Sequence, residues 1–224
     1  MIRRLPLVLL ALSSACATGF GEAATGTVDV VLVPAGTVSG GVRFETIELT
    51  VGEVLLEADD EAPPQDDGHG HSHSHAHLVA GLRSDSDQGV RSLDLLGAAQ
   101  PLASLEVPAS KFVALTLVAA TPAGGCALFA EGTTDLGGSP TPVRICLAAD
   151  GELSSAPLEL EVGRDEAVSV RLLVSVNALL TGVDLSRIAP TDGSIVIDDR
   201  STPFDAGVIR KNLTTAFRAS AEGT

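Results

Sequence analysis

The five histidines of the chain lie within nine consecutive residues and alternate with small residues; they are His69, His71, His73, His75 and His77. Histidine binds metal ions through a neutral ring nitrogen. In an extended chain, side chains two positions apart point the same way, so several imidazoles can converge on one ion. This pattern favours Zn, Cu(II) or Ni(II). Asp66 and Asp67 lie just upstream and would add carboxylate oxygens to the same ion.

A second interpretation rests on the same composition. Asp, Gly, His, Ser and Pro are also the residues of a solvated loop, and a His-rich tract is identified by composition alone. Such a loop loses conformational entropy when it binds an ion, which predicts modest affinity and little discrimination between metals. The segment from Asp59 to His77 is therefore either a metal site or a polar insertion without a ligand.

The elements that must position this segment belong to a chain of 224 residues, of which 45% are apolar. Trp and Tyr are absent and only six Phe are present, so the core must be aliphatic. The formal charge of −15 disfavours nucleic-acid partners, whose phosphates require a basic surface. It disfavours an anionic membrane surface for the same reason, whereas it attracts cations.

Residues 1–15 are predicted to be a signal peptide that the mature protein lacks. They have a basic start, and their apolar run 5–12 is too short to span a bilayer. The stretch Leu12-Ser13-Ser14-Ala15-Cys16 resembles the bacterial lipobox, whose cysteine is lipidated and becomes the N-terminus, although its leucine lies one place too far upstream. Ordinary signal-peptidase cleavage after Ala17 or near Ala24 is the alternative.

The number of cysteines favours lipidation. Three cysteines are an odd number for an exported protein. If Cys16 carries the lipid, Cys126 and Cys146 remain as a pair in an oxidising compartment, where we expect them to form a disulfide. The prediction is an exported lipoprotein of the bacterial envelope, held on the outer membrane and facing the periplasm or the exterior. Residues 16–26 are then its tether.

Short segments with a strand pattern fill most of the remaining chain. They are residues 27–33, 42–51, 54–56, 78–82, 90–96, 102–107, 111–121, 158–162, 168–176 and 195–197. In 42–51, the side chains of Ile47, Leu49 and Val51 share a predicted core face, and Gly52 allows a bend or bulge before 54–56. Segment 78–82 is expected to return beside 54–56. Segment 111–121 is apolar on both faces, which marks a central buried strand.

The cysteine pair also predicts a hairpin, with strands 126–131 and 141–146 in register around Leu136. Towards the C-terminus, apolar residues recur at helical spacing behind Asp205, a candidate N-cap; they are Phe204, Val208, Leu213 and Phe217. A short C-terminal helix is expected there, with a strand at 206–210 as its alternative. The fold class is therefore an all-β, antiparallel β-sandwich of immunoglobulin-like or transthyretin-like shape. It forms a single domain over 27–224, with the His-rich insertion at about 59–77.

Several of these segments resemble a family of bacterial lipoprotein domains of unknown function. They are Val28–Pro34 with Phe44–Leu56, Ser92–Leu96, Leu105–Phe112 and Val168–Val176. The family's Asp-Ala-Pro motif lacks its Asp at Val33-Pro34-Ala35, and Ser110 and Phe112 replace the Gly and Tyr of its Leu-Pro-Ala-Gly-x-Tyr turn. The resemblance implies an exported β-sandwich. It implies no activity and no catalytic residues, and the histidines are not part of the family pattern.

We expect the chain not to be an enzyme. A catalytic triad requires a histidine held rigidly by the fold, yet every histidine lies in one run. No nucleophile elbow, phosphate-binding loop or His-Glu-x-x-His motif is present. The favoured function is a non-catalytic binding or structural module that contacts an envelope protein or polymer. The alternative is a lipoprotein that binds Zn, Cu or Ni through the His-rich insertion.

Overall fold

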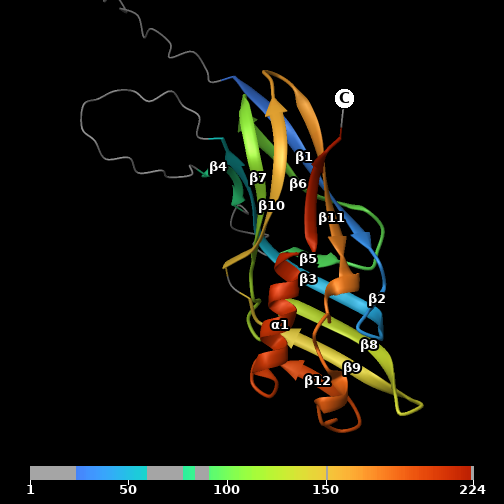
Figure 1. The fold of residues 1–224 in the computed structure, drawn as a ribbon. Helices are drawn as coiled ribbons and strands as arrows, with labels where there is room; N and C mark the ends of the chain where they lie inside the picture. Colours follow the sequence, from blue (N-terminus) through green and yellow to red (C-terminus); the bar gives the residue numbers. More distant parts are fainter. Residues whose placement is uncertain (1–23, 60–77, 84–90, 150, 223–224) are drawn as a thin grey trace, which may run out of the picture.

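The structure is a computed structural model that describes residues 24–59, 78–83, 91–149 and 151–222. These ranges contain thirteen strands: β1 (Thr25–Ala35), β2 (Val38–Ser39), β3 (Val42–Ala58), β4 (Leu78–Arg83), β5 (Arg91–Asp94), β6 (Gln100–Pro108), β7 (Ser110–Ala119), β8 (Leu128–Leu136), β9 (Ser139–Leu147), β10 (Gly151–Val162), β11 (Ala167–Ser175), β12 (Ile195–Asp198) and β13 (Phe217–Ala221). They also contain two 3₁₀ helices, η1 (Val176–Ala178) and η2 (Leu185–Arg187), and one α-helix, α1 (Pro203–Thr214). The strands form two sheets, which confirms the all-β sandwich with a short C-terminal helix (Figure 1).

The smaller sheet, sheet A, has the strand order β13-β11-β1-β6. The larger sheet, sheet B, has the order β10-β7-β3-β8-β9-β12, and β2, β4 and β5 also pair with β3. Most neighbouring strands are antiparallel, while β1 with β11 and β9 with β12 run parallel. The predicted central strand is confirmed, because β7 lies between β10 and β3 and buries most of its side chains.

Strand β3 is 17 residues long and is shared by both halves of sheet B. Its first half pairs with β8, and its second half pairs with β7 and β4. The predicted bulge at Gly52 is confirmed by a register shift against β7 between Val51 and Glu53. A second shift, between Phe44 and Thr46, was not predicted. It buries Phe44 as well as Ile47, which an unbroken strand would turn to opposite faces.

Strands β8 and β9 form the predicted hairpin with its Cys126–Cys146 disulfide. The predicted register is wrong, because Cys146 lies opposite Phe129 and Cys126 precedes β8. Leu136 ends β8 and is not the centre of the hairpin. The turn is Gly137–Gly138, and both residues have positive φ. Glycine adopts this backbone without steric cost, which suits a two-residue hairpin turn.

Helix α1 confirms the expected C-terminal helix, and the alternative strand at 206–210 is wrong. Pro203 occupies the start of the helix and Thr202 its N-cap position, so Asp205 lies in the first turn and is not the cap. Phe217 does not belong to the helix. It begins β13, pairs with Val174 of β11 and is 5% exposed.

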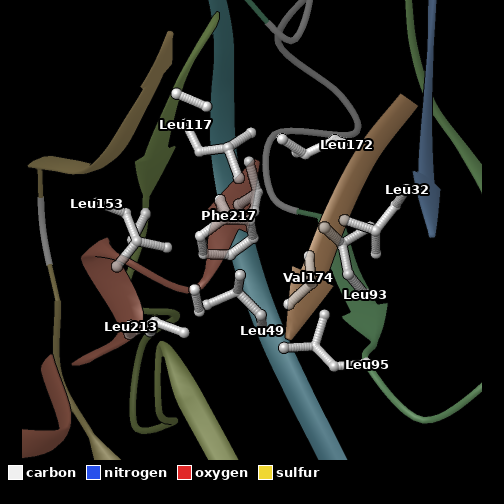
Figure 2. Packing of buried hydrophobic residues seen from close by; sticks show 14 of the residues in the cluster. Leu32, Leu49, Leu93, Leu95, Leu117, Leu153, Leu172, Val174, Leu213 and Phe217 are labelled. Atoms are coloured by element: carbon white, nitrogen blue, oxygen red, sulfur yellow. The ribbon is translucent and has the colours of Figure 1, made fainter. Parts of the chain in front are cut away.

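The core between the sheets is aliphatic, as the composition predicts. Leu32 of β1, Leu49 of β3 and Leu117 of β7 are at most 1% exposed. Figure 2 shows these side chains turned toward one interior, together with Phe217 from the edge strand β13. Burial of each such side chain stabilises the fold by about 1.5–3 kcal/mol relative to its exposure to water. This packing holds both sheets rigid and so fixes the ends from which the connecting segments leave.

Candidate functional site

The candidate ligands of the metal site all lie outside the described residues. They are His69, His71, His73, His75, His77, Asp66 and Asp67, and the lipidation candidate Cys16 lies outside them as well. Of the predicted site residues, Cys126 and Cys146 are described, and they form the expected disulfide. What the structure describes of the candidate site is therefore the strands and turns to which these segments are joined.

The His-rich insertion is flanked by two paired strands. The backbone of β4 lies antiparallel to the end of β3, with Leu56 opposite Ala80 and Glu57 opposite Leu78. This confirms the predicted return of residues 78–82 beside 54–56. The N–H of Asp59 donates to the carbonyl of Lys111 at the start of β7, with an N···O distance of 2.9 Å. Both ends of the insertion therefore start from the same end of sheet B.

The start of β1 lies at this end too. Thr25 is opposite Pro108, the last residue of β6, and the N–H of Ala109 donates to the carbonyl of Ala24 at 2.7 Å. Ala109 connects β6 to β7, so Ala24 and Asp59 are bonded to residues only two positions apart in the sequence. Figure 1 shows the beginning of β1 and the end of β3 at one end of the sandwich. The N-terminal segment and the insertion thus leave the body close together.

The surface at this end carries acidic side chains as well as the exposed Lys111 and Arg164. Glu106, Asp165 and Glu166 line a shallow hollow beside the first residues of β1. The hydroxyl of Thr25 donates to the Glu106 carboxylate at 3.2 Å, and the N–H of Gly163 donates to the Glu166 carboxylate at 2.6 Å. The carboxylates of Glu106 and Glu166 thus each accept a hydrogen bond within the fold. In the part of the chain that the structure describes, no group of three or more His, Cys, Asp or Glu residues could hold a metal ion.

The outer face of sheet A carries a second candidate, a strip of apolar side chains between two arginines. Val33 and Leu173 lie opposite each other on the parallel strands β1 and β11, and Val31 lies opposite Arg171. Leu173 is 40% exposed, and the two valines are partly exposed. Arg218 of β13 is the neighbour of Leu173 on its other side. We call these five residues the sheet A strip.

The charges around the sheet A strip differ from the acidic balance of the whole chain. Arg171 forms an ion pair with Glu222, whereas Arg218 has no ion-pair partner among the described residues. Asp29 lies one row away and accepts a hydrogen bond from the hydroxyl of Ser104 at 2.6 Å. Exposed apolar groups next to an arginine are the features that protein interfaces favour. The sheet A strip is thus a surface suited to a partner with apolar and acidic groups.

Two carboxyl groups with lowered pKa values serve local turns. The Ser201 backbone N–H and hydroxyl, followed by the Arg200 backbone N–H and charge, lower the pKa of Asp198. The Ser186 hydroxyl and N–H, helped by the charge of Arg187, lower the pKa of Asp184. In both cases hydrogen bonds to the ionised form are the main cause. These carboxylates order the turns before α1 and at η2.

A polar network that the sequence patterns did not predict joins α1 to sheet B. The carboxylate of Asp199 pairs with the guanidinium of Arg210 and accepts a hydrogen bond from the N–H of Ala148 at 2.7 Å. Arg210 also donates to the carbonyl of Ala148 at 3.0 Å. The two side chains thus satisfy both backbone groups of the residue that follows β9. Asp199 and Arg210 are eleven positions apart in the sequence, and this spacing does not predict that they pair.

Comparison of the chain with protein-family models, curated proteins and solved structures gives no match. No helix in the described ranges is long and apolar enough to cross a membrane. The resemblance to the bacterial lipoprotein family therefore stays a prediction from the sequence.

Proposed function

We propose that the chain is a lipoprotein of the bacterial cell envelope that acts as a non-catalytic binding or structural module. In this proposal the lipid on Cys16 anchors an exported sandwich to the outer membrane, on the periplasmic or the exterior side. The single observation that carries the binding role is the sheet A strip, in which Leu173 is 40% exposed beside Arg218, an arginine with no ion-pair partner in the described part of the chain. The partner is an envelope protein or polymer with apolar and acidic groups.

The rigidity of sheet A supports this role. The strip lies on β1 and β11, whose opposite faces bury Val30, Leu172 and Val174 completely. A surface that is fixed by its own core loses little conformational entropy when a partner binds. Apolar side chains at the centre of an interface with arginine at the rim then supply affinity and orientation.

A photo-crosslinking residue placed at position 173 of the chain in intact cells tests this proposal. The matched control is position 113, because Val113 is 43% exposed on a strand of sheet B. We expect a discrete adduct from position 173 and none from position 113. The adduct should disappear when Arg218→Glu is added, since this change reverses the charge beside the strip. Equal adducts from both positions would contradict a binding role for this face.

Anchoring is tested separately. Replacement of Cys16 with Ser should release the protein from the membrane fraction, because the thiol that carries the lipid is lost. Unchanged fractionation would refute the lipoprotein proposal.

The second candidate function is metal binding by the His-rich insertion with Zn, Cu or Ni. The observation that favours it is the alternation of five histidines in nine residues behind Asp66 and Asp67. The pairing of β3 with β4 supports it further, since both ends of the insertion are held beside each other. The ordering entropy of the segment limits the affinity.

Calorimetric titration with Zn, Cu and Ni, with and without residues 66–77, separates the two functions. We expect binding that the deletion abolishes. Imidazole must be neutral to bind a metal, so the affinity should fall steeply below about pH 6. Affinity that does not change with pH, or weak millimolar binding to all three metals, would leave the first function alone.

A further inference from the structure

We infer that the sandwich stands with its β6–β7 end toward the membrane and its β8–β9 turn away from it. The inference rests on the proposed lipidation of Cys16 and adds the orientation in which the lipoprotein works. It follows from where β1 begins, from the length of the tether and from the length of β3.

The tether is short. Ala24 is bonded to Ala109 at the β6–β7 end, and only eight peptide steps separate it from Cys16. A fully extended chain advances about 3.5 Å per residue, so these steps reach at most about 28 Å. The β6–β7 end therefore lies within about 28 Å of the lipid headgroups, whatever conformation the tether takes.

The body is longer than the tether. β3 runs from Val42 to Ala58, which is hydrogen-bonded to β7 at the membrane end. At about 3.3 Å per residue, the 17 residues of this strand extend over about 50 Å. An inverted sandwich would need a tether of at least that length along its side. The inverted orientation is thus excluded by geometry.

Charge disfavours the remaining alternative, a sandwich that lies flat. The chain carries a formal charge of −15, and the headgroup surface of a bacterial membrane is also negative. An upright body brings only its short end to this surface, where the exposed carboxylates of Glu106 and Asp165 are partly balanced by the exposed Lys111 and Arg164, whereas a flat body would bring a long face of the acidic chain. Repulsion between like charges holds the long faces of the body away from the lipid, so the upright orientation remains.

The orientation defines the kind of partner that each part of the surface meets. Asp59 and Leu78 lie at the membrane end, so this end of sheet B faces partners that are embedded in the membrane. The turn at Gly137–Gly138 lies at the far end, where Thr134 and Thr133 of β8 are opposite Val42 and Arg43. That end is open to soluble partners.

Energy transfer to an acceptor dye on lipid headgroups tests the orientation. Lipidated full-length protein with a donor dye at Ala109→Cys or at Ser139→Cys is bound to vesicles that contain anionic phosphatidylglycerol. Both residues are exposed, one at each end of the body, and the native Cys126 and Cys146 are bonded to each other. We expect transfer from position 109 to be at least threefold more efficient than transfer from position 139. Equal or reversed efficiencies would overturn the orientation.

Two controls keep this result separate from the anchor itself. Vesicle binding that Cys16→Ser abolishes supports the anchor, and wild-type protein that does not bind vesicles would overturn the anchor together with the orientation. An added segment of 20 Gly and Ser residues between Ala17 and Ala24 contributes about 25 Å of root-mean-square length. With it, the ratio of the two efficiencies should fall toward one; an unchanged ratio would show that the tether does not set the orientation.

Discussion

The contribution of the Cys126–Cys146 disulfide to stability can be calculated from the length of the loop that it closes. Its two cysteines are 20 positions apart in the sequence. Closing a loop of this length in the unfolded chain removes entropy worth about 3 kcal/mol at 25 °C. The double variant Cys126→Ser with Cys146→Ser should therefore lose about 3 kcal/mol of unfolding free energy.

The native hairpin should survive the change. The N–H of Ala127 donates to the carbonyl of Leu147 at 2.8 Å, and the N–H of Thr50 donates to the carbonyl of Ala127 at 2.7 Å. These bonds hold the start of β8 on both sides without the disulfide. The effect thus falls mainly on the unfolded chain, which becomes more expanded, and the denaturant slope should rise slightly.

Urea unfolding at neutral pH measures the loss, in a Cys16→Ser background that leaves no other thiol. A reducing agent should lower the stability of the parent by the same amount and leave the double variant unchanged. A loss below about 1 kcal/mol would refute the account of the disulfide as a constraint on the unfolded chain.

Three further predictions concern single side chains. A Cβ on Gly132 would come within 2.4 Å of the Arg43 carbonyl, so Gly132→Ala should cost about 1–3 kcal/mol, whereas Gly207→Ala in α1 meets nothing and should stabilise by about 0.5–1 kcal/mol; urea unfolding measures both. Phe112→Ala should cost about 3–5 kcal/mol in the same assay, because that ring is 1% exposed, while Val113→Ala on the outer face should cost under about 1 kcal/mol. The pKa of Asp198 is lowered in the folded chain from its ordinary value of 3.8, so its contribution to stability is complete above about pH 4 and is lost as the pH falls through the lowered value. As the pH is lowered, the unfolding free energy should accordingly fall less steeply for Asp198→Asn than for the parent. Identical curves would contradict the hydrogen bonds to this carboxylate.

Local patterns in the sequence predict the strands well because side-chain alternation reports which face is buried. The alternation in 168–176 places Arg171 and Leu173 on one face, and β11 has them there. The same rule fails at Glu45, where a bulge lets Phe44 and Ile47 both reach the core. A bulge of this kind is a property of two paired strands, so one strand alone does not reveal it.

Pairing between distant segments limits what the sequence could predict about the candidate sites. The parallel contact of β1 with β11 joins residues about 140 positions apart, and together with the pairing of β11 with β13 it creates the sheet A strip. Likewise, the approach of Ala24 to Asp59 depends on the pairing of β1 with β6 and of β3 with β7. The predicted hairpin register is wrong because it places Cys126 opposite Cys146, whereas Cys126 precedes the first residue of β8.

The continuity of β3 has a consequence for how the molecule comes apart. If β8 and β9 separated from β3, the edge of β3 would be exposed as far as the bulge at Gly52. Beyond this bulge, β3 is paired with β7. Both halves of sheet B are thus paired with the same strand, β3, so the loss of one half exposes a strand that also belongs to the other. Heating should melt both halves in a single step, and a protease cut at Gly52 should leave two fragments that cannot hold their shape apart.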